Sequence, residues 1–228
     1  MRPYLIFTLT AALGSMGELA GHERRGTLLW PGRSAILGLL GAACGIRRGG
    51  DFSRLDRLSL AVAIFDEGQA LRDYHTYQTI PSAAVKAPNS RPEALIAAGL
   101  RSNTAITLRD YRCTPLYGIA LWSDDDAPLE PLRDALRRPA FTLYLGRKAC
   151  PLAAPPGAQV IEAHTPQDAL QHLNLPAWRK YARAHRLVRD AATGEVVHDL
   201  PLDRLKWHFA PRSVAIDRVD IAPSEGAS

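Results

Sequence analysis

The stretch RSAILGLLGAACGI, residues 33–46, decides the fold, because its apolar residues recur at the spacing of one helical face. That face is formed by Ile36, Leu39, Leu40 and Ala43. Pro31 lies near the expected start of the helix, and Gly45 can end it, because glycine readily adopts a left-handed backbone conformation. Gly38 and Gly41 lie inside the pattern, and we expect them to let the helix pack closely on a sheet.

Strands are predicted on both sides of this helix. Apolar and threonine side chains alternate along residues 4–10, which predicts a half-buried strand rather than a signal peptide. Residues 58–65, 117–122 and 141–145 are predicted as three further strands, and the leucines of residues 129–136 mark a second amphipathic helix. The resulting order is βαββαβ, the ferredoxin-like plan of α+β proteins that RRM-type RNA-binding proteins also use.

The chain of 228 residues has room for one substantial core and a smaller appended unit. We predict a ferredoxin-like domain at residues 1–150 and, after a Pro- and Gly-rich break, a small β-rich C-terminal elaboration at residues 151–228 that packs on it. The elaboration is expected to contain a hairpin at residues 187–200, turned at residues 192–194. Within the first domain, residues 77–104 are rich in Pro, Ser, Asn and Ala, which predicts a long excursion from the core.

The charge balance favours an acidic partner. The 28 Lys and Arg residues exceed the 23 Asp and Glu residues, which gives a net charge of +5 and a pI near 9.3. Most of the basic residues are Arg, whose planar guanidinium binds phosphates and stacks on bases, so the composition favours nucleic acid. Cys44, Cys113 and Cys150 cannot all pair and lack metal-ligand spacing, so we expect a reducing, cytoplasmic environment.

Common enzyme motifs are absent from the sequence. It contains no His-Glu-x-x-His, Gly-x-Ser-x-Gly, P-loop or EF-hand pattern. It also contains no apolar run that approaches the roughly 20 residues needed to cross a bilayer. We therefore predict no metal, no cofactor and no membrane association.

Three segments carry candidate RNA contacts. In LRDYHT, residues 71–76, Tyr74 and His75 could stack on RNA, or they could cleave it by metal-free general acid and base catalysis. The segment YLGRK, residues 144–148, joins an aromatic residue, a glycine and two cations, which suits close approach to a phosphate. At Arg33-Ser34 the helix N-terminus offers N–H groups to a phosphate, although Ser34 could simply cap the helix.

Four blocks of the sequence resemble a known family: YLI at 4–6 with the helix at 33–46, LRDYHT at 71–76, YLGRKACPL at 144–152 and FAPR at 209–212. They are similar to those of the Cas-five proteins, CRISPR-associated members of the RAMP superfamily, and in particular to the Cas-five subunit of type I-E Cascade. The resemblance implies a protruding β-hairpin thumb, which would account for an excursion at about residues 77–112.

The resemblance also implies a function. Such subunits bind the 5′ handle of the crRNA, cap one end of the backbone filament, and contact the Cas-seven backbone subunit and the large, Cas-eight type subunit; target DNA is reached only through the complex. Because a separate nuclease makes the crRNA in type I-E systems, no catalytic activity is expected. The residues predicted to contact RNA are Arg24, Arg25, Arg33, Ser34, Arg72, Tyr74, His75, Arg109, Arg112, Tyr144, Gly146, Arg147, Lys148 and Arg212.

Two other functions stay open on the sequence. The chain could be a metal-independent endoribonuclease that processes precursor crRNA, as the Cas-five protein of type I-C systems does, with His75 and Tyr74 as the first candidates. It could also be a ferredoxin-like enzyme or sensor for a small molecule, which would need a deep apolar pocket with convergent titrating groups.

Overall fold

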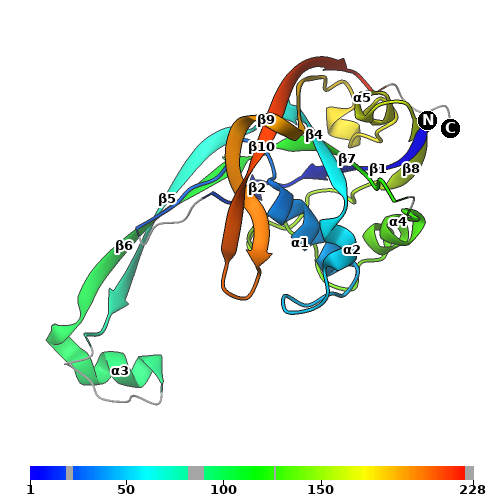
Figure 1. Cartoon of the computed structure of the whole chain (residues 1–228). Helices are drawn as coiled ribbons and strands as arrows, with labels where there is room; N and C mark the ends of the chain where they lie inside the picture. Colours follow the sequence, from blue (N-terminus) through cyan, green and yellow to red (C-terminus); the bar gives the residue numbers. More distant parts are fainter. Residues whose placement is uncertain (19–22, 82–89, 126, 224–228) are drawn as a thin grey trace.

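The computed structural model in Figure 1 describes residues 1–18, 23–81, 90–125 and 127–223. It has a mixed α/β architecture built on mostly antiparallel sheets. The main sheet has six strands in the order β10-β9-β4-β7-β1-β8, and each neighbouring pair is antiparallel. Its strands are β1 (Arg2–Thr10), β4 (Ser59–Asp66), β7 (Leu116–Trp122), β8 (Gln159–Ala163), β9 (Ala184–Asp203) and β10 (His208–Ile221).

Helices cover both faces of the main sheet (Figure 1). On one face α1 (Arg33–Ala43), α2 (Ser53–Asp56) and α4 (Glu130–Arg137) pack with one set of β1 side chains, including Phe7. On the other face α5 (Pro166–Leu170) packs with the alternate set, including Ile6. The prediction of a half-buried first strand is therefore wrong, because α5 buries the face that the sequence pattern left to solvent. None of the helices in the described part of the chain is long and apolar enough to cross a membrane.

Both predicted helices are confirmed, but the role expected for the glycines of α1 is wrong. Gly45 follows the helix with φ +77, as expected for a glycine that ends a helix. A Cβ on Gly41 would lie 2.5 Å from the Phe52 ring, whereas a Cβ on Gly38 would meet nothing within 4 Å. Gly41 therefore makes room for an aromatic ring next to α2, and neither glycine brings the helix closer to the sheet.

The prediction of a strand at residues 141–145 is wrong. This segment has only an isolated bridge between Tyr144 and Pro151. The N–H groups of Ala140 and Phe141 donate instead to the carbonyls at the C-terminal end of α1, at 2.9 and 3.2 Å. Because those donors satisfy helix carbonyls, they do not join a strand ladder, and the next strand of the main sheet after β7 is β8.

The predicted hairpin turn at residues 192–194 is also wrong. β9 continues through this segment, and the pairing with β10 jumps from Asp190 to Val196 while the partner residues are consecutive, so residues 191–195 form a large bulge. The true turn lies between β9 and β10, where the Asp203 carboxylate accepts the N–H groups of Leu205 and Lys206. β8, β9 and β10 join β1 and β4 in one sheet, so strands from both sides of residue 150 lie together.

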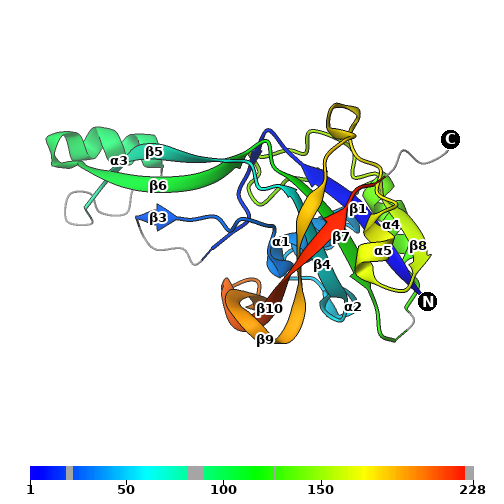
Figure 2. The same ribbon diagram turned by 90° about the horizontal axis from the view of Figure 1, so that it is seen from above.

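A long hairpin leaves the main sheet (Figure 2). It consists of β5 (Gln69–Thr79) and β6 (Asn103–Cys113), with α3 (Arg91–Ala98) and the short η1 helix (Gly99–Arg101) at its far end. Two short strands, β2 (Leu13–Gly14) and β3 (Arg24–Arg25), pair with β6. The excursion from the core thus begins at Gln69 rather than at Tyr77; residues 82–89 lie outside the described residues.

Ion pairs fix the root of this hairpin. The Glu67 carboxylate binds Arg112 and Arg186, at 3.3 and 2.6 Å. Asp66 binds Arg179 of η2 (Ala177–Arg179) at 2.6 Å. Gly68 turns the corner with φ +71, and a Cβ there would lie only 2.2 Å from the Cys113 carbonyl oxygen. The direction of the hairpin is therefore held by ion pairs between the corner that precedes β5 and arginines of β6, β9 and η2, and by a glycine at the corner.

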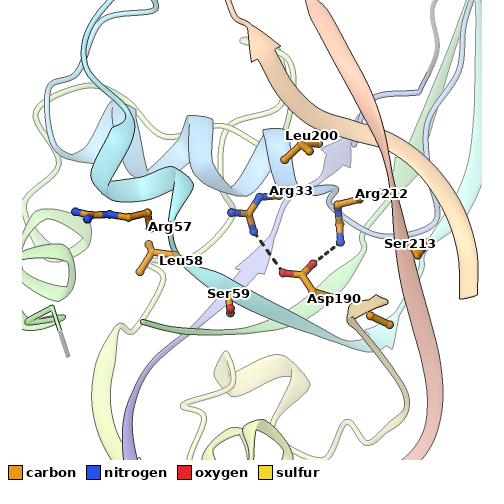
Figure 3. Close-up of a pocket in the computed structure, with 9 residues that line it drawn as sticks. Arg33, Arg57, Leu58, Ser59, Asp190, Leu200, Arg212 and Ser213 are labelled. Atoms are coloured by element: carbon orange, nitrogen blue, oxygen red, sulfur yellow. Dashed lines mark hydrogen bonds and ion pairs between the residues drawn. The ribbon is translucent and has the colours of Figure 1, made fainter. Parts of the chain in front are cut away.

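A second ion cluster joins the β9–β10 hairpin to α1 (Figure 3). Asp190 binds both Arg33 and Arg212. The Asp199 carboxylate accepts the N–H of Arg33 at 2.6 Å and binds the Arg212 guanidinium through both oxygens. Because the side chains of Arg212 and Asp199 are only 10% and 5% exposed, each charge depends on its partner.

The variant Asp199→Ala should lower the free energy of unfolding by about 3 kcal/mol, because it removes the acceptor of a helix N–H group and leaves the buried Arg212 guanidinium with Asp190 as its remaining carboxylate. The matched control is Asp217→Ala, which breaks a more exposed pair with Arg189 and should cost less than about 1 kcal/mol. Urea unfolding followed by circular dichroism measures both, and equal losses would contradict the buried role of Asp199.

Candidate nucleic-acid interface

The β5–β6 hairpin presents two different faces, because successive side chains of a strand point to opposite sides. Cross-strand partners share a face, so the register places His75 with Thr107, and Asp73 with Arg109, on what we call the His75 face. The Tyr74 face is the opposite one, and it also carries Arg72 and Asp110. The two candidate residues Tyr74 and His75 therefore point away from each other.

On the Tyr74 face the basic residues are largely neutralised. Arg24 and Arg72 both donate to Asp110, with shortest distances of 2.9 and 2.7 Å. The hydrogen bond from Arg72 is the main cause that lowers the pKa of Asp110, and Arg24 adds to it. These side chains line a hollow of about 320 Å³ together with Thr27. Tyr74 is 63% exposed on this face. It therefore offers an aromatic ring beside Asp110, whose carboxylate binds both Arg24 and Arg72.

On the His75 face, two guanidinium groups have N–H donors without an acceptor among the described residues. Arg147 stacks on the Tyr111 ring, with its Cζ 4.6 Å from the ring centroid, and donates to the Arg25 carbonyl at 3.4 Å. In the described part of the chain, Arg147 Nη1 and Arg109 Nε are buried without a hydrogen-bond partner. Lys148, the residue after Arg147, is exposed. Buried donors with no acceptor are costly, and both arginines are half-buried, so a small shift of each side chain would let a phosphate oxygen accept a charge-assisted hydrogen bond from it.

Gly146 explains how Arg147 reaches β6. It has φ +84, and a Cβ at this position would lie 1.5 Å from the Ser15 carbonyl oxygen. Ser15 donates its N–H to the Leu145 carbonyl at 3.1 Å, and Leu145 donates to the Cys150 carbonyl at 2.8 Å. The segment that follows β1 and the segment that contains Arg147 are thus in backbone contact, which directs the guanidinium onto Tyr111. Tyr144, half-buried, supports this loop through its bridge to Pro151.

Three of the predicted RNA contacts lie inside the protein. Arg33 and Arg212 belong to the ion cluster of Figure 3, and Arg112 is held by the side chain and carbonyl of Glu67. The α1 N-terminus, predicted to accept a phosphate next to Ser34, already binds the Asp199 carboxylate. In the structure each of these guanidinium groups is thus largely buried against a carboxylate, and a carboxylate already occupies the helix terminus.

The two residues considered for RNA cleavage, His75 and Tyr74, do not lie on the same face of the hairpin. The His75 ring stacks on Tyr77 with 6.4 Å between ring centroids, and it makes no hydrogen bond or ion pair with any described residue. Tyr74 lies on the other face and cannot act with it on one phosphate group. The described residues also contain no group of three or more His, Cys, Asp or Glu side chains that could hold a metal ion.

The predicted RNA contacts do not include Tyr111, Asp110 or Ser15, although the family resemblance implies that residues 107–112 lie on the return side of the thumb. The first two lie on the return strand of the hairpin, and strand alternation alone could have separated them onto opposite faces once the register was known. Ser15 contributes only its carbonyl and N–H groups. A backbone contact of this kind leaves no signal in the residue type.

Comparison with known proteins gives a consistent result. A family model described as CRISPR-associated protein (Cas_Cas5) matches residues 4–215. The chain is 35% identical over 231 residues to "CRISPR system Cascade subunit CasD" of Escherichia coli (strain K12), covering 93% of this chain and 94% of the relative. Among solved structures, a chain of "CRISPR RNA-guided surveillance complex" is similar in fold, with a TM-score of 0.70, 23% identity, and coverage of 96% and 90%. "Crystal structure of Cas protein" gives a TM-score of 0.65, 24% identity, and coverage of 96% and 95%.

Gly146→Ala should lower the free energy of unfolding by at least about 1–3 kcal/mol, because a side chain at this φ is strained and its Cβ would overlap the Ser15 carbonyl. Gly38→Ala is the matched control: its Cβ enters open space inside a helix, so stability should rise by about 0.5–1 kcal/mol. Thermal unfolding measures both, and a neutral Gly146→Ala would show that the two loops are not in backbone contact.

Proposed function

The chain belongs to the Cas5 family of CRISPR-associated proteins, and on that premise we propose that it is a crRNA-binding, non-catalytic subunit of a CRISPR surveillance complex of the Cascade kind. The observation that carries the proposal is the set of unsatisfied guanidinium donors on the His75 face, at Arg109 and Arg147. A subunit that binds an RNA backbone needs such donors, and no acceptor for them exists in the described part of the chain.

We assign the 5′ handle of the crRNA to the His75 face. Arg109 and Arg147 would bind phosphate oxygens, and Lys148 would add a further positive charge. Tyr77 is exposed near His75 and offers a ring on which a base can stack. The Tyr74 face would contribute less to RNA binding, because Arg24 and Arg72 already bind Asp110 there.

The fold supports this assignment. Omitting the last two strands, the sheet order β8-β1-β7-β4 is that of an antiparallel ferredoxin-like sheet whose strands follow the βαββαβ series, and we infer that β9 and β10 elaborate it. The β5–β6 hairpin then corresponds to the thumb expected from the family. We propose that the Cas-seven backbone subunit and the large, Cas-eight type subunit bind around this body, so that target DNA is met only within the complex.

Replacing Arg147 with Ala should weaken the binding of synthetic handle RNA about tenfold, because one charge-assisted contact is lost. The slope of log affinity against log salt should fall by about 0.7, as expected for one fewer phosphate contact to a single strand. Arg109→Ala should act in the same way. Fluorescence anisotropy with the Cas-seven subunit present measures both. The control is Arg218→Ala, an exposed arginine of β10, which should change neither quantity; indifference to Arg147→Ala and Arg109→Ala would refute the assignment.

Incubation of the purified chain with repeat RNA in EDTA should give no specific product, because His75 and Tyr74 lie on opposite faces. Denaturing gel electrophoresis reads the result. A product that forms in the native chain and disappears in His75→Ala, but persists in Arg218→Ala, would replace the proposal with a metal-independent endoribonuclease.

A further inference from the structure

A second basic and aromatic surface lies at the turn end of the β9–β10 hairpin. It is formed by the segment between α1 and α2, residues 44–52, and by residues 202–209 around the turn. Side-chain contacts join the two: Arg48 lies on Trp207, and the Leu205 side chain lies where a Cβ added to Gly49 would be 3.5 Å from it. In Figure 1 this end of the hairpin lies beside the helices of the body, apart from the projecting β5–β6 hairpin. We call it the turn surface.

Trp207 is the centre of the turn surface. It is 60% exposed, and its backbone has φ +57, a conformation that residues with a side chain rarely adopt. The Arg48 guanidinium carbon lies 4.0 Å from the centroid of its ring, and the Phe209 ring lies 6.3 Å away, tilted by 53°. An indole that stays exposed while a cation and a second ring support it is preorganised to stack on another flat group.

The charges around Trp207 favour an anionic partner. The basic residues of the turn surface are Arg47, Arg48, Arg204 and Lys206, and its carboxylates are Asp51 and Asp203. Asp51 accepts the Ser53 N–H, and Asp203 accepts two N–H groups of the turn and also pairs with Lys206 at 3.8 Å. Arg204 is bound by Asp56, which leaves Arg47 and Arg48 as the cations of this surface that have no carboxylate partner among the described residues. Arg47 is exposed and has no ion-pair partner among the described residues.

We propose that the turn surface binds a single-stranded nucleic-acid segment, with one base stacked on Trp207 and adjacent phosphates bound by Arg47 and Arg48. An exposed ring flanked by cations is the arrangement by which proteins bind unpaired strands without reading their sequence. A duplex hides its bases in the stack, so the indole favours an unpaired strand. The turn surface shares no residue with the His75 face, so it is a second nucleic-acid site and does not rest on the proposed function.

Fluorescence anisotropy of the full-length chain with labelled dT15 and U15 oligonucleotides, each in a salt series, tests the proposal. Trp207→Ala should weaken binding about tenfold with an unchanged salt slope, because stacking is not ionic. The double variant Arg47→Ala with Arg48→Ala should reduce the slope by about 1.4, the value for two phosphate contacts to a single strand. Comparison of the two oligonucleotides distinguishes DNA from RNA as the bound strand.

The matched controls are Trp178→Ala, which removes an indole that is 65% exposed elsewhere, and Arg218→Ala. Neither should alter binding, and circular dichroism verifies that all variants are folded. A chain with Arg109→Ala and Arg147→Ala should keep the binding that depends on Trp207, so failure of the handle site and failure of the turn surface give different results. Equal affinity of native and Trp207→Ala chains would overturn the proposal, and the exposed Leu205 and Trp207 would then be assigned to a protein contact.

Discussion

Two consecutive carboxylates, Asp66 and Glu67, form the constraint on which the rest of the molecule depends. They stand where β4 ends and the projecting hairpin begins, and three guanidinium groups bind them: those of Arg112, Arg179 and Arg186. Because these arginines come from β6, η2 and β9, the corner ties together both strands of the hairpin and the C-terminal third of the chain. This junction sets the position of the candidate RNA-binding face relative to the sheet, and the pairing of β2 and β3 with β6 adds to it.

Most arginines of this protein serve its own structure. Arg33 and Arg212 hold the β9–β10 hairpin against α1, and Arg112 holds the hairpin root. A basic composition thus overstates the surface available to a polyanion. What distinguishes Arg109 and Arg147 is the lack of an acceptor for a buried donor within the described residues, and that property depends on the fold rather than on charge.

The sequence predicted those parts of the fold that depend on local periodicity. The helix at 33–43, the helix at 130–137 and three strands of the main sheet follow from apolar spacing, and the structure confirms them. The failures have a common cause in distant contacts. Residues 141–145 have strand composition, but their neighbouring N–H groups cap α1, and Gly194, which carries a strong turn signal, lies in a bulge because β10 continues to pair on either side of it. The same holds for the candidate site. The segment YLGRK was predicted from its composition, but the position of Arg147 depends on a backbone contact with Ser15, which no sequence spacing indicates.

The β5–β6 hairpin connects β4 and β7, which are adjacent central strands of the main sheet. An insertion between two neighbouring antiparallel strands begins and ends at nearly the same point, so its length is uncoupled from the packing of the core. Adding or removing two consecutive residues in each strand would move α3 by about 6.6 Å. Side chains nearer the root would still point to the same face of the hairpin. The reach of this arm can therefore change in steps, by evolution or by design, without any change in the sheet that carries it.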